Sequence, residues 1–315
     1  MQQTSKGKST YRCTPARIVH RVLPVVILPT LFIATGCPPD GSVLDNGQNG
    51  GAAVDSTPLD PNVPPITQGN WYRPTADTTW QWQLQPDGSG TINTTYDVVI
   101  YDIDLFDNDA AIITQLQNAG RKVICYFSAG SFEDFRADAD QFLPADLGKT
   151  LAGFADERWL DIRSSNVRRI MQSRLDLAVR KGCDGVEPDN VTGFSEDTGF
   201  PLSAGDQLAF NRFLANEAHQ RGLSVALKND LPQIPELIDY FDFSVNEQCH
   251  EFSECGLLQP FLEAGKPVLN AEYADGFVND AETRQTMCAE SLSQDIRSLV
   301  LPIDLDDSLR FSCDP

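Results

Sequence analysis

A (β/α)8 barrel, or TIM barrel, is the fold that the sequence predicts. About 245 residues follow Trp71, which suits one large domain of this kind. Helical patterns end at a glycine and lead within a few residues into a short apolar run, at Gly120, Gly182, Gly222 and Gly265. This alternation is typical of βα units around a parallel sheet.

Eight apolar runs are the candidate strands, and polar residues follow most of them. They lie at 80–84, 98–104, 123–128, 185–190, 224–229, 243–248, 268–273 and 298–304. Eight strands favour a closed barrel over an open, doubly wound sheet. The sequence has no glycine-rich phosphate loop, which would have favoured the open sheet.

The helices between these strands have one apolar face. After residue 165 the apolar residues recur at helical spacing, at Val167, Ile170, Met171, Leu175 and Ala178. Further along, Ser203 with Asp206 three residues later predicts a helix start. Such helices would lie on the outside of the sheet.

The N-terminal 68 residues are expected to lie outside the barrel. Residues 1–36 carry five basic residues, no acid and then an apolar run, which is the pattern of a signal peptide. The run ends in ATGC, which resembles a bacterial lipobox, so Cys37 is expected to carry lipid. Ordinary cleavage nearby and an uncleaved anchor are the alternatives. Residues 37–68, rich in Pro, Gly, Asp and Asn, are expected to form a flexible linker, which leaves 69–315 for the barrel.

This leader implies an exported protein, lipid-anchored at the bacterial cell envelope or secreted if the anchor is absent. Without the five basic residues of the leader, 19 basic and 45 acidic residues give a net charge of −26. Such a charge disfavours nucleic acid and anionic lipid heads as partners, so the lipid is the one expected contact with a membrane. It favours a cationic partner or simply keeps an exported protein soluble. We expect a monomer.

Six of the eight cysteines follow Cys37 and belong to the exported domain, where disulfides can persist. The disulfide candidates are Cys249, Cys255, Cys288 and Cys313. Cys125 and Cys183 lie in or beside apolar strand patterns and are expected to be buried thiols. No CxxC pair and no histidine-containing zinc spacing is present, so we expect neither a metal nor a cofactor.

Polar residues gather where the predicted strands end. Glu187 and Asp189 are two apart, so they share one face of a strand, with Asp189 nearer its end. Other strand ends carry Asp102, Asp104, Lys228, Asn229, Asn246, Glu247, Glu272, Tyr273 and Asp304. Each acid alone would be read as a solvated loop residue or a helix cap. Together, at the rim where barrels build active sites, they predict a carboxylate-based site.

Two carboxylates without a catalytic histidine, a serine triad or metal spacing fit glycoside hydrolysis best. One acid protonates the leaving oxygen, and the other supports the developing positive charge as nucleophile or base. Lys228 beside the acids would hold one of them ionised. Aromatic residues near the rim would stack on sugar rings or pack in the core, and they are Trp80, Trp82, Tyr101, Tyr126 and Tyr273.

Eight segments follow one another between Trp80 and Tyr273. They are WQWQL, YDIDLFD, VICYFSAGSFEDFR, WLDIR, GCDGVEPDNV, ALKND, VNEQCHEFSEC and NAEY. In this order they resemble the endo-α-1,4-polygalactosaminidase glycoside hydrolases, glycoside hydrolase family 114. The resemblance implies a TIM barrel that cleaves α-1,4-linked galactosamine-containing polysaccharide, an amino-sugar polymer that is cationic wherever its amines are free.

The resemblance also implies roles for particular residues. By position, Asp189 matches the nucleophile and Glu247 the acid/base, and we expect retention of anomeric configuration. Surrounding positions expected to bind substrate are Asp102, Asp104, Tyr126, Glu187, Asn190, Lys228, Asn229, Glu272 and Tyr273. Where the family is expected to read DNVD, this chain has Thr192 in place of the last acid, which leaves one flanking substrate contact open.

Two other functions remain open from the sequence. One is a lipoprotein that binds amino-sugar polysaccharide without cleaving it, which the presence of both Asp189 and Glu247 disfavours. The other is a metal-dependent phosphodiesterase barrel with Asp102, Asp104 and Glu187 as oxygen ligands. The small number of histidines makes this the weakest of the three readings.

Overall fold

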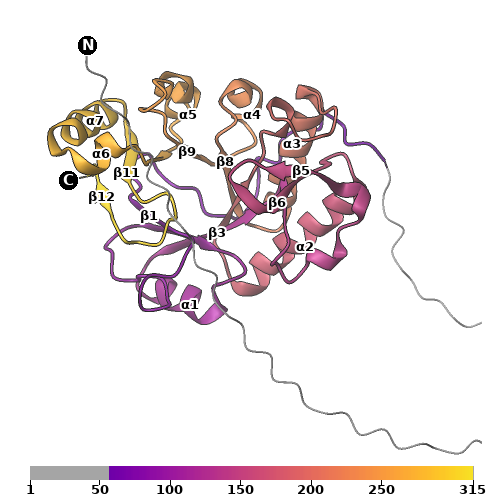
Figure 1. Ribbon diagram of the computed structural model, residues 1–315, viewed down its shortest axis with the longest axis horizontal. Coiled ribbons are helices and arrows are strands. Elements are labelled where there is room, and N and C mark those ends of the chain that lie inside the picture. Colours follow the sequence, from indigo (N-terminus) through magenta and orange to yellow (C-terminus); the bar gives the residue numbers. More distant parts are fainter. Residues whose placement is uncertain (1–56, 315) are drawn as a thin grey trace, which may run out of the picture. The chain divides into compact units, whose positions relative to one another are not determined.

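The computed structural model describes residues 57–314, and eight parallel strands curl into a barrel-type sheet (Figure 1). The eight strands are β1 (Trp80–Gln83), β2 (Ile100–Asp104), β3 (Lys122–Ser128), β7 (Gly185–Asp189), β8 (Ser224–Lys228), β9 (Phe243–Glu247), β10 (Val268–Glu272) and β11 (Ile296–Val300). They are hydrogen-bonded in this order, and a short strand, β12 (Phe311–Ser312), pairs antiparallel with β11. All eight predicted strands are therefore present.

The first and last parallel strands meet without a continuous ladder. No pairing of β1 with β11 occurs among the described residues. Instead, the Trp80 indole on β1 donates to the carbonyl of Arg297 on β11 at 2.9 Å. The N–H groups of Leu84 and Gln85 both donate to the carbonyl of Leu305, each at 3.1 Å. Side-chain and loop hydrogen bonds thus join the two ends of the sheet, where a closed barrel would have backbone pairing between strands.

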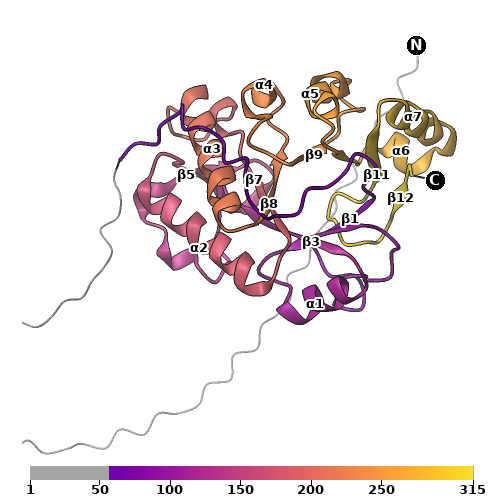
Figure 2. The same ribbon diagram turned by 180° about the vertical axis from the view of Figure 1, so that it is seen from behind.

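The helices lie on the outer side of the strands (Figures 1 and 2). They are α1 (Ala110–Asn118), α2 (Ser165–Lys181), α3 (Ala204–Gln220), α4 (Ile234–Leu237), α5 (Gln259–Glu263), α6 (Asp275–Asn279) and α7 (Ala281–Ser293). Short 3-10 helices are η1 (Ala139–Gln141), η2 (Pro144–Asp146), η3 (Gly193–Ser195), η4 (Leu231–Gln233) and η5 (Cys255–Leu258). The connection from β1 to β2 has no helix, so the outer layer is thinner there.

Local sequence signals set the ends of the two long helices. The predicted apolar stripe of α2 is buried, and α2 ends at Gly182 in the left-handed region with φ 88°. The Ser203 N–H donates to Asp206 Oδ2 at 2.8 Å, and the Asp206 N–H donates to Ser203 Oγ at 3.2 Å. This reciprocal capping box begins α3, as the sequence predicts.

A small antiparallel sheet that the sequence pattern does not predict is inserted between β3 and α2. It consists of β4 (Ser131–Glu133), β5 (Leu147–Leu151) and β6 (Phe154–Leu160), in the order β4-β6-β5. It follows directly from the carboxyl end of β3, so it lies at the rim of the barrel that carries the predicted site.

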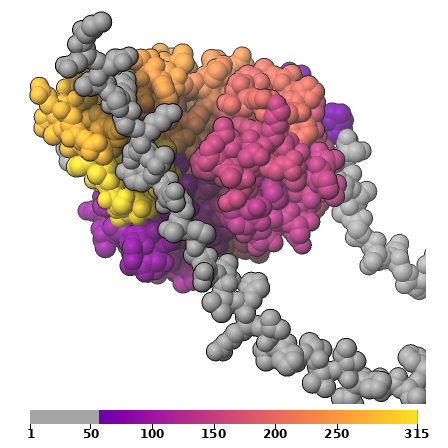
Figure 3. All heavy atoms as spheres, viewed as in Figure 1, coloured from indigo at the N-terminus to yellow at the C-terminus, as the bar shows by residue number. Residues whose placement is uncertain are grey.

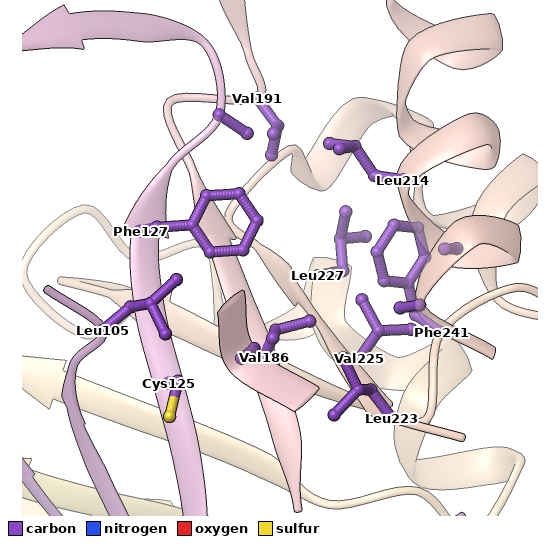
Figure 4. Packing of buried hydrophobic residues seen from close by; sticks show 14 of the residues in the cluster. Leu105, Cys125, Phe127, Val186, Val191, Leu214, Leu223, Val225, Leu227 and Phe241 are labelled. Atoms are coloured by element: carbon purple, nitrogen blue, oxygen red, sulfur yellow. The ribbon is translucent and has the colours of Figure 1, made fainter. Parts of the chain in front are cut away.

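Two apolar layers pack on the two faces of the strands. Inside the barrel, Trp80 and Trp82 pack with residues such as Phe243 and Leu299. Outside, the opposite faces of the strands pack against the helices, as Figure 4 shows for Phe127 and Leu214. Burial of Trp80 and Tyr101 excludes both as stacking surfaces for a sugar. These two aromatic residues belong to the core.

Three disulfides tie the domain together. Cys249–Cys255 and Cys288–Cys313 join the four predicted candidates. The expectation of buried thiols at Cys125 and Cys183 is wrong, because these two cysteines form the third disulfide with a Cα–Cα distance of 6.1 Å. Cys125 lies on β3 and Cys183 just before β7, and β3 pairs with β7. A separation of 58 residues hides this proximity in the sequence.

Residues 57–68, the described end of the predicted linker, contact the barrel. The N–H of Ile66 donates to Asn216 Oδ1 at 2.8 Å, and Asn216 Nδ2 donates to the carbonyl of Pro64 at 3.0 Å. In this stretch the structure differs from the expected flexible linker, because carbonyl groups of Pro61 and Pro64 accept hydrogen bonds from side chains of α3. Cys37, the predicted signal peptide and the rest of the linker lie outside the described residues. None of the helices in 57–314 has both the length and the apolar composition of a membrane span.

Candidate active site

The carboxyl ends of three neighbouring strands converge on Lys228. Its Nζ lies 3.2 Å from Glu187 Oε1, 3.2 Å from Asp189 Oδ2 and 3.3 Å from Glu247 Oε2. Lys228 is 2% exposed. Burial by itself would lower the pKa of Lys228, but Asp189, Glu247 and Glu187 raise the pKa well above its ordinary value. Lys228 therefore stays a cation among the three acids. The sequence predicts a lysine in this position, beside acids of which it would hold one ionised.

The two predicted catalytic carboxylates face the same nitrogen atom. Because Asp189 Oδ2 and Glu247 Oε2 lie 3.2 and 3.3 Å from Lys228 Nζ, these two oxygens are at most 6.5 Å apart, the sum of the two distances. The pair is remote in sequence and adjacent in the fold. Two carboxylates within this limit can reach one sugar linkage from both sides.

Glu247 accepts hydrogen bonds at both of its oxygens. Tyr273 Oη donates to Oε1 at 2.7 Å, and Asn229 Nδ2 donates to Oε2 at 3.1 Å. The side chain of Asn229 also accepts from the N–H of Glu247 at 3.0 Å. Burial opposes ionisation of Glu247, but Lys228, Tyr273 and Asn229 outweigh it and lower the pKa of this carboxyl. Three predicted site residues thus hold Glu247 in one orientation.

Asp189 is held by the turn that follows β7. The N–H of Asn190 donates to Asp189 Oδ1 at 2.7 Å, and Asn190 has the left-handed φ of 59°. The Asp189 carbonyl accepts from the N–H groups of Ala129 and Gly130, at 2.8 and 3.1 Å. A Cβ on Gly130 would lie 1.7 Å from the Asn190 carbonyl oxygen, so the close contact of these two turns requires glycine.

Asp102 and Glu187 lie beneath the cleft rather than on its surface, in contrast to the substrate-binding role expected of them. Both are fully buried, and neither lines the cleft. Burial and the charge of Glu187 raise the pKa of Asp102 well above its usual range. Burial also raises the pKa of Glu187 to about 7, against the opposing effect of Lys228. These surroundings favour the protonated form of Asp102, and Glu187 in turn faces Lys228.

Asp104 lines the cleft together with Arg136, which binds its carboxylate. Arg136 donates from Nη1 and Nη2 to the two oxygens of Asp104, at 3.1 and 2.6 Å. Backbone N–H groups of Phe106 and Asp107 donate to Oδ1 of the same carboxylate, at 2.7 and 2.8 Å. Arg136 also lies 2.7 Å from Glu133. Asp104 lines the cleft, but its oxygens are already engaged by the protein.

Glu272 supports a loop and does not line the cleft. It is fully buried and accepts from the N–H of His250 at 2.8 Å and from Asn270 Nδ2 at 2.9 Å. The expected contact of Glu272 with substrate is therefore not available in this structure, because the carboxylate points into the loop that the Cys249–Cys255 disulfide closes.

The cleft has two adjoining lobes, with volumes of about 710 and 250 Å³. Figure 3 shows this face of the molecule, where the surface is hollowed between the magenta insertion and the yellow C-terminal loop. Both lobes are lined by Tyr126, Phe154, Glu157, Asp189, Lys228, Glu247 and Ile303. The smaller lobe also includes Asn190, Thr192 and Asn229. The carboxylates thus stand where the two lobes meet.

Sequence reasoning missed the residues that the inserted sheet brings to this cleft. Arg136, Glu133, Phe154 and Glu157 all line the larger lobe and come from the insertion. Phe154 is 57% exposed, and Ile303 on the other side is 68% exposed. One signal was available, because the stretch between the third and fourth predicted strands is much longer than one helix requires.

The described residues do not form an open metal site. Asp104 is bound by Arg136, while Asp102 and Glu187 are buried under Lys228. The side chains of Cys249, His250 and Cys255 lie close enough together for a metal, but the two cysteines are joined in a disulfide and offer no thiolate. The acids that the phosphodiesterase alternative requires are therefore used in other contacts.

A barrel with paired carboxylates in a cleft at its carboxyl rim defines a carbohydrate-cleaving enzyme of the TIM-barrel type. The sequence profile of glycoside-hydrolase family GH114 matches residues 61–315, so the chain belongs to this family and is a glycoside hydrolase. The resemblance seen in the sequence is thereby confirmed.

Solved structures agree with this family and fold. Ega3 of Aspergillus fumigatus, solved in complex with galactosamine, is 42% identical, covers 78% of this chain and 99% of its own, and superposes with a TM-score of 0.73. The glycoside hydrolase domain of PelA from Pseudomonas aeruginosa is 17% identical, covers 76% of this chain and 99% of its own, and has a TM-score of 0.57, which shows the fold alone. A comparison with curated protein sequences gives no match.

Proposed function

We propose that this glycoside hydrolase cuts α-1,4-linked galactosamine-containing polysaccharide within the chain. The observation that carries the proposal is the position of Asp189 and Glu247 where two adjoining lobes meet, so sugar units can lie on both sides of the cleaved bond. The choice of sugar is supported by the 42% identity with Ega3, whose structure holds galactosamine. The acids of the larger lobe suit a cationic amino sugar.

The reaction proceeds by a retaining, two-step mechanism. Asp189 attacks the anomeric carbon and forms a glycosyl ester while the bond to the leaving oxygen breaks, and Glu247 gives its proton to that oxygen. A water then gives a proton to Glu247 and attacks the same carbon, which releases Asp189. Lys228 orients Asp189 and places a positive charge beside it, since its Nζ lies 3.2 Å from Oδ2.

The short separation of the two carboxylates supports retention. Retaining enzymes place the pair about 5–5.5 Å apart, and inverting enzymes place it about 6.5–9.5 Å apart to admit a water. The upper limit of 6.5 Å between Asp189 Oδ2 and Glu247 Oε2 falls at the lower edge of the inverting range. Proton NMR of the first-formed product tests this step, and an inverted anomer would refute it.

Glu247 must gain a proton before it can act as an acid. In the free site its pKa is lowered, because Lys228, Tyr273 and Asn229 outweigh the effect of burial. A bound sugar displaces water from the carboxyl and thereby favours its neutral form. This requirement makes the assignment of the two roles the step to test directly.

Azide rescue separates the two roles. In Asp189→Ala, azide takes the place of the nucleophile and gives a glycosyl azide of inverted configuration. In Glu247→Ala, azide instead attacks the glycosyl ester on Asp189 and gives a product of retained configuration. The opposite pattern would exchange the two assignments.

Digestion of α-1,4-linked galactosamine oligosaccharides, with sizing of the fragments, tests the activity. The wild type should release internal fragments, and Asp189→Asn and Glu247→Gln should each lose about 10³-fold or more in kcat/KM while still binding. Asp134→Asn is a matched control, because Asp134 is exposed and lies outside the cleft. Binding without cleavage by the wild type would instead indicate a non-catalytic binding protein.

We also propose that the protein is exported as a monomer with a lipid at Cys37. The leader pattern supports export, and three disulfides in the described chain are typical of exported proteins. Mass spectrometry of the mature N-terminus tests the lipid, and a first residue other than a modified Cys37 would refute it. Light scattering tests the monomer.

A further inference from the structure

We infer that Glu157, a residue of the inserted sheet, receives a free amine of the substrate and so selects deacetylated sugar units. This inference rests on the proposed function and assigns one residue as its determinant of specificity. It depends on the charge partners of the acids in the cleft, on the burial and hydrogen bonding of Glu157, and on its position between the two lobes.

Most of the half-buried or buried acids that line the cleft already have a cation beside them. Asp104 and Glu133 share Arg136, at 2.6 and 2.7 Å. Asp189 and Glu247 share Lys228, at 3.2 and 3.3 Å. Within the part of the chain that the structure describes, Glu157 has no lysine, arginine or histidine within 4.0 Å.

The surroundings of Glu157 prepare one of its oxygens for a ligand. Ser131 Oγ donates to Oε2 at 2.6 Å, and no hydrogen bond from the described residues reaches Oε1. The charged groups that face Glu157 are Glu133 on β4, Asp189 on β7 and Arg136. Burial, with the charges of Glu133 and Asp189, raises the pKa of Glu157 to about 7. An arriving cation would lower this pKa and complete the pairing that the protein leaves open.

The position of Glu157 fits contact with a sugar next to the reacting one. Glu157 lines both lobes together with Asp189 and Glu247. Its partner Ser131 also accepts from Asn190 Nδ2 at 3.2 Å, and Asn190 holds Asp189. Phe154 stands near it at the start of the same strand and offers an exposed aromatic ring to the cleft.

The chemistry distinguishes an ammonium group from an acetamido group. A protonated amine can donate to Oε1 and neutralise the carboxylate. An N-acetyl group carries no charge, and its bulk would leave the ionised carboxylate partly desolvated and without a partner. Glu157 therefore favours the free amine at its own subsite, whichever sugars occupy the rest of the cleft.

The test compares Glu157→Gln with the wild type on two substrates. These are an α-1,4-linked galactosamine oligosaccharide and the same oligosaccharide after partial N-acetylation. Glutamine keeps the shape and can still accept from Ser131, so only the charge is lost. We expect kcat/KM on the free-amine substrate to fall about 10- to 100-fold, and the preference over the acetylated substrate to fall by a similar factor. Asp134→Asn removes a carboxylate charge directly after β4 of the same small sheet, and it should alter neither value more than about twofold.

Three outcomes would overturn the inference. An unchanged substrate preference in Glu157→Gln would show that Glu157 does not recognise the amine. An equal loss on both substrates would show that it acts through Ser131 and Asn190 on the catalytic centre. If the wild type cleaves neither oligosaccharide, the proposed function fails and this inference fails with it. If the wild type cleaves them and Glu157→Gln has no effect, only the inference is refuted.

Discussion

Replacement of Lys228 by methionine removes the cation that three carboxylates share. Its Nζ lies 3.2 Å from Glu187 and from Asp189 and 3.3 Å from Glu247. At an effective dielectric constant of about 20, each pair at this distance interacts by about 5 kcal/mol, and the cost of burying the charges offsets part of that energy. Loss of one partner of a buried pair typically costs about 3–5 kcal/mol. We take about 3 kcal/mol as the expected loss of unfolding free energy, because Asp189 and Glu247 are partly exposed to water.

The loss should depend on pH because of Glu187. Burial raises the pKa of Glu187 to about 7, against the opposing effect of Lys228. A raised pKa in the folded state means that stability is greatest below the unfolded pKa of about 4.3 and declines as the pH rises toward 7. Without Lys228 the pKa of Glu187 rises further, so the decline continues above pH 7. The difference between wild type and Lys228→Met should therefore grow between about pH 6 and about pH 8.5.

Urea unfolding of four proteins measures this coupling. They are the wild type, Lys228→Met, Glu187→Gln and the double variant. In the Glu187→Gln background the fully buried carboxylate is already neutral, so Lys228→Met should cost about 1–2 kcal/mol less at alkaline pH. Both proteins that lack Lys228 should lose about 100-fold or more in kcat/KM, because Asp189 and Glu247 lose their shared partner. If the two substitutions add within about 0.5 kcal/mol at every pH, the account of the site is refuted.

Three further predictions concern the groups around this centre. Burial raises the pKa of Asp230 to about 8, so the free energy of unfolding of the wild type should decline as the pH rises from about 4 toward 8. Asp230→Asn should flatten this profile in urea unfolding and raise the free energy of unfolding by about 1–3 kcal/mol at pH 8. An unchanged profile would contradict this prediction. Joint replacement of Cys125 and Cys183 by alanine opens a 58-residue loop and should lower the free energy of unfolding by about 4 kcal/mol, which a denaturation midpoint equal to that of the wild type would disprove. Gly130→Ala places a Cβ 1.7 Å from a facing backbone carbonyl oxygen and should reduce kcat/KM about 100-fold or more, whereas Gly256→Ala, with nothing within 4 Å, is the control and should not.

The sequence predicted the strands well because their signals are local. Gly120, Gly182, Gly222 and Gly265 all have the positive φ that a helix stop requires, from 68° to 88°. Each is followed within a few residues by an apolar run that forms a strand. The inserted sheet has no glycine stop followed by an apolar run. Its three short strands pair antiparallel, and one pairing has register shifts. Pairing of this kind depends on contacts that a single sequence does not reveal.

The sequence indicated which residues gather at the site, but not which of them are buried beneath the cleft. Alternation along β7 correctly placed Glu187 and Asp189 on one face, with Asp189 nearer the mouth: Glu187 is fully buried, and the Asp189 side chain is 19% exposed. It could not show that Asp102 and Glu187 form a buried pair, because that contact joins two strands separated by β3. The hydrogen bonds from Arg136 to Asp104 likewise join the insertion to the end of β2, which are separate in the sequence.

The charge balance of the cleft explains why so many acids can remain there. Lys228 contributes one positive charge to Glu187, Asp189 and Glu247. Burial and the charge of Glu187 favour the neutral form of Asp102, which reduces the excess. The centre is still negative, because one cation cannot balance even the two carboxylates of the proposed catalytic pair. Burial of such an excess is unfavourable in the empty enzyme and becomes less so when a cation enters. The proposed substrate would supply that cation wherever its amines are free, so the same negative field that destabilises the empty cleft would stabilise the complex with a cationic sugar.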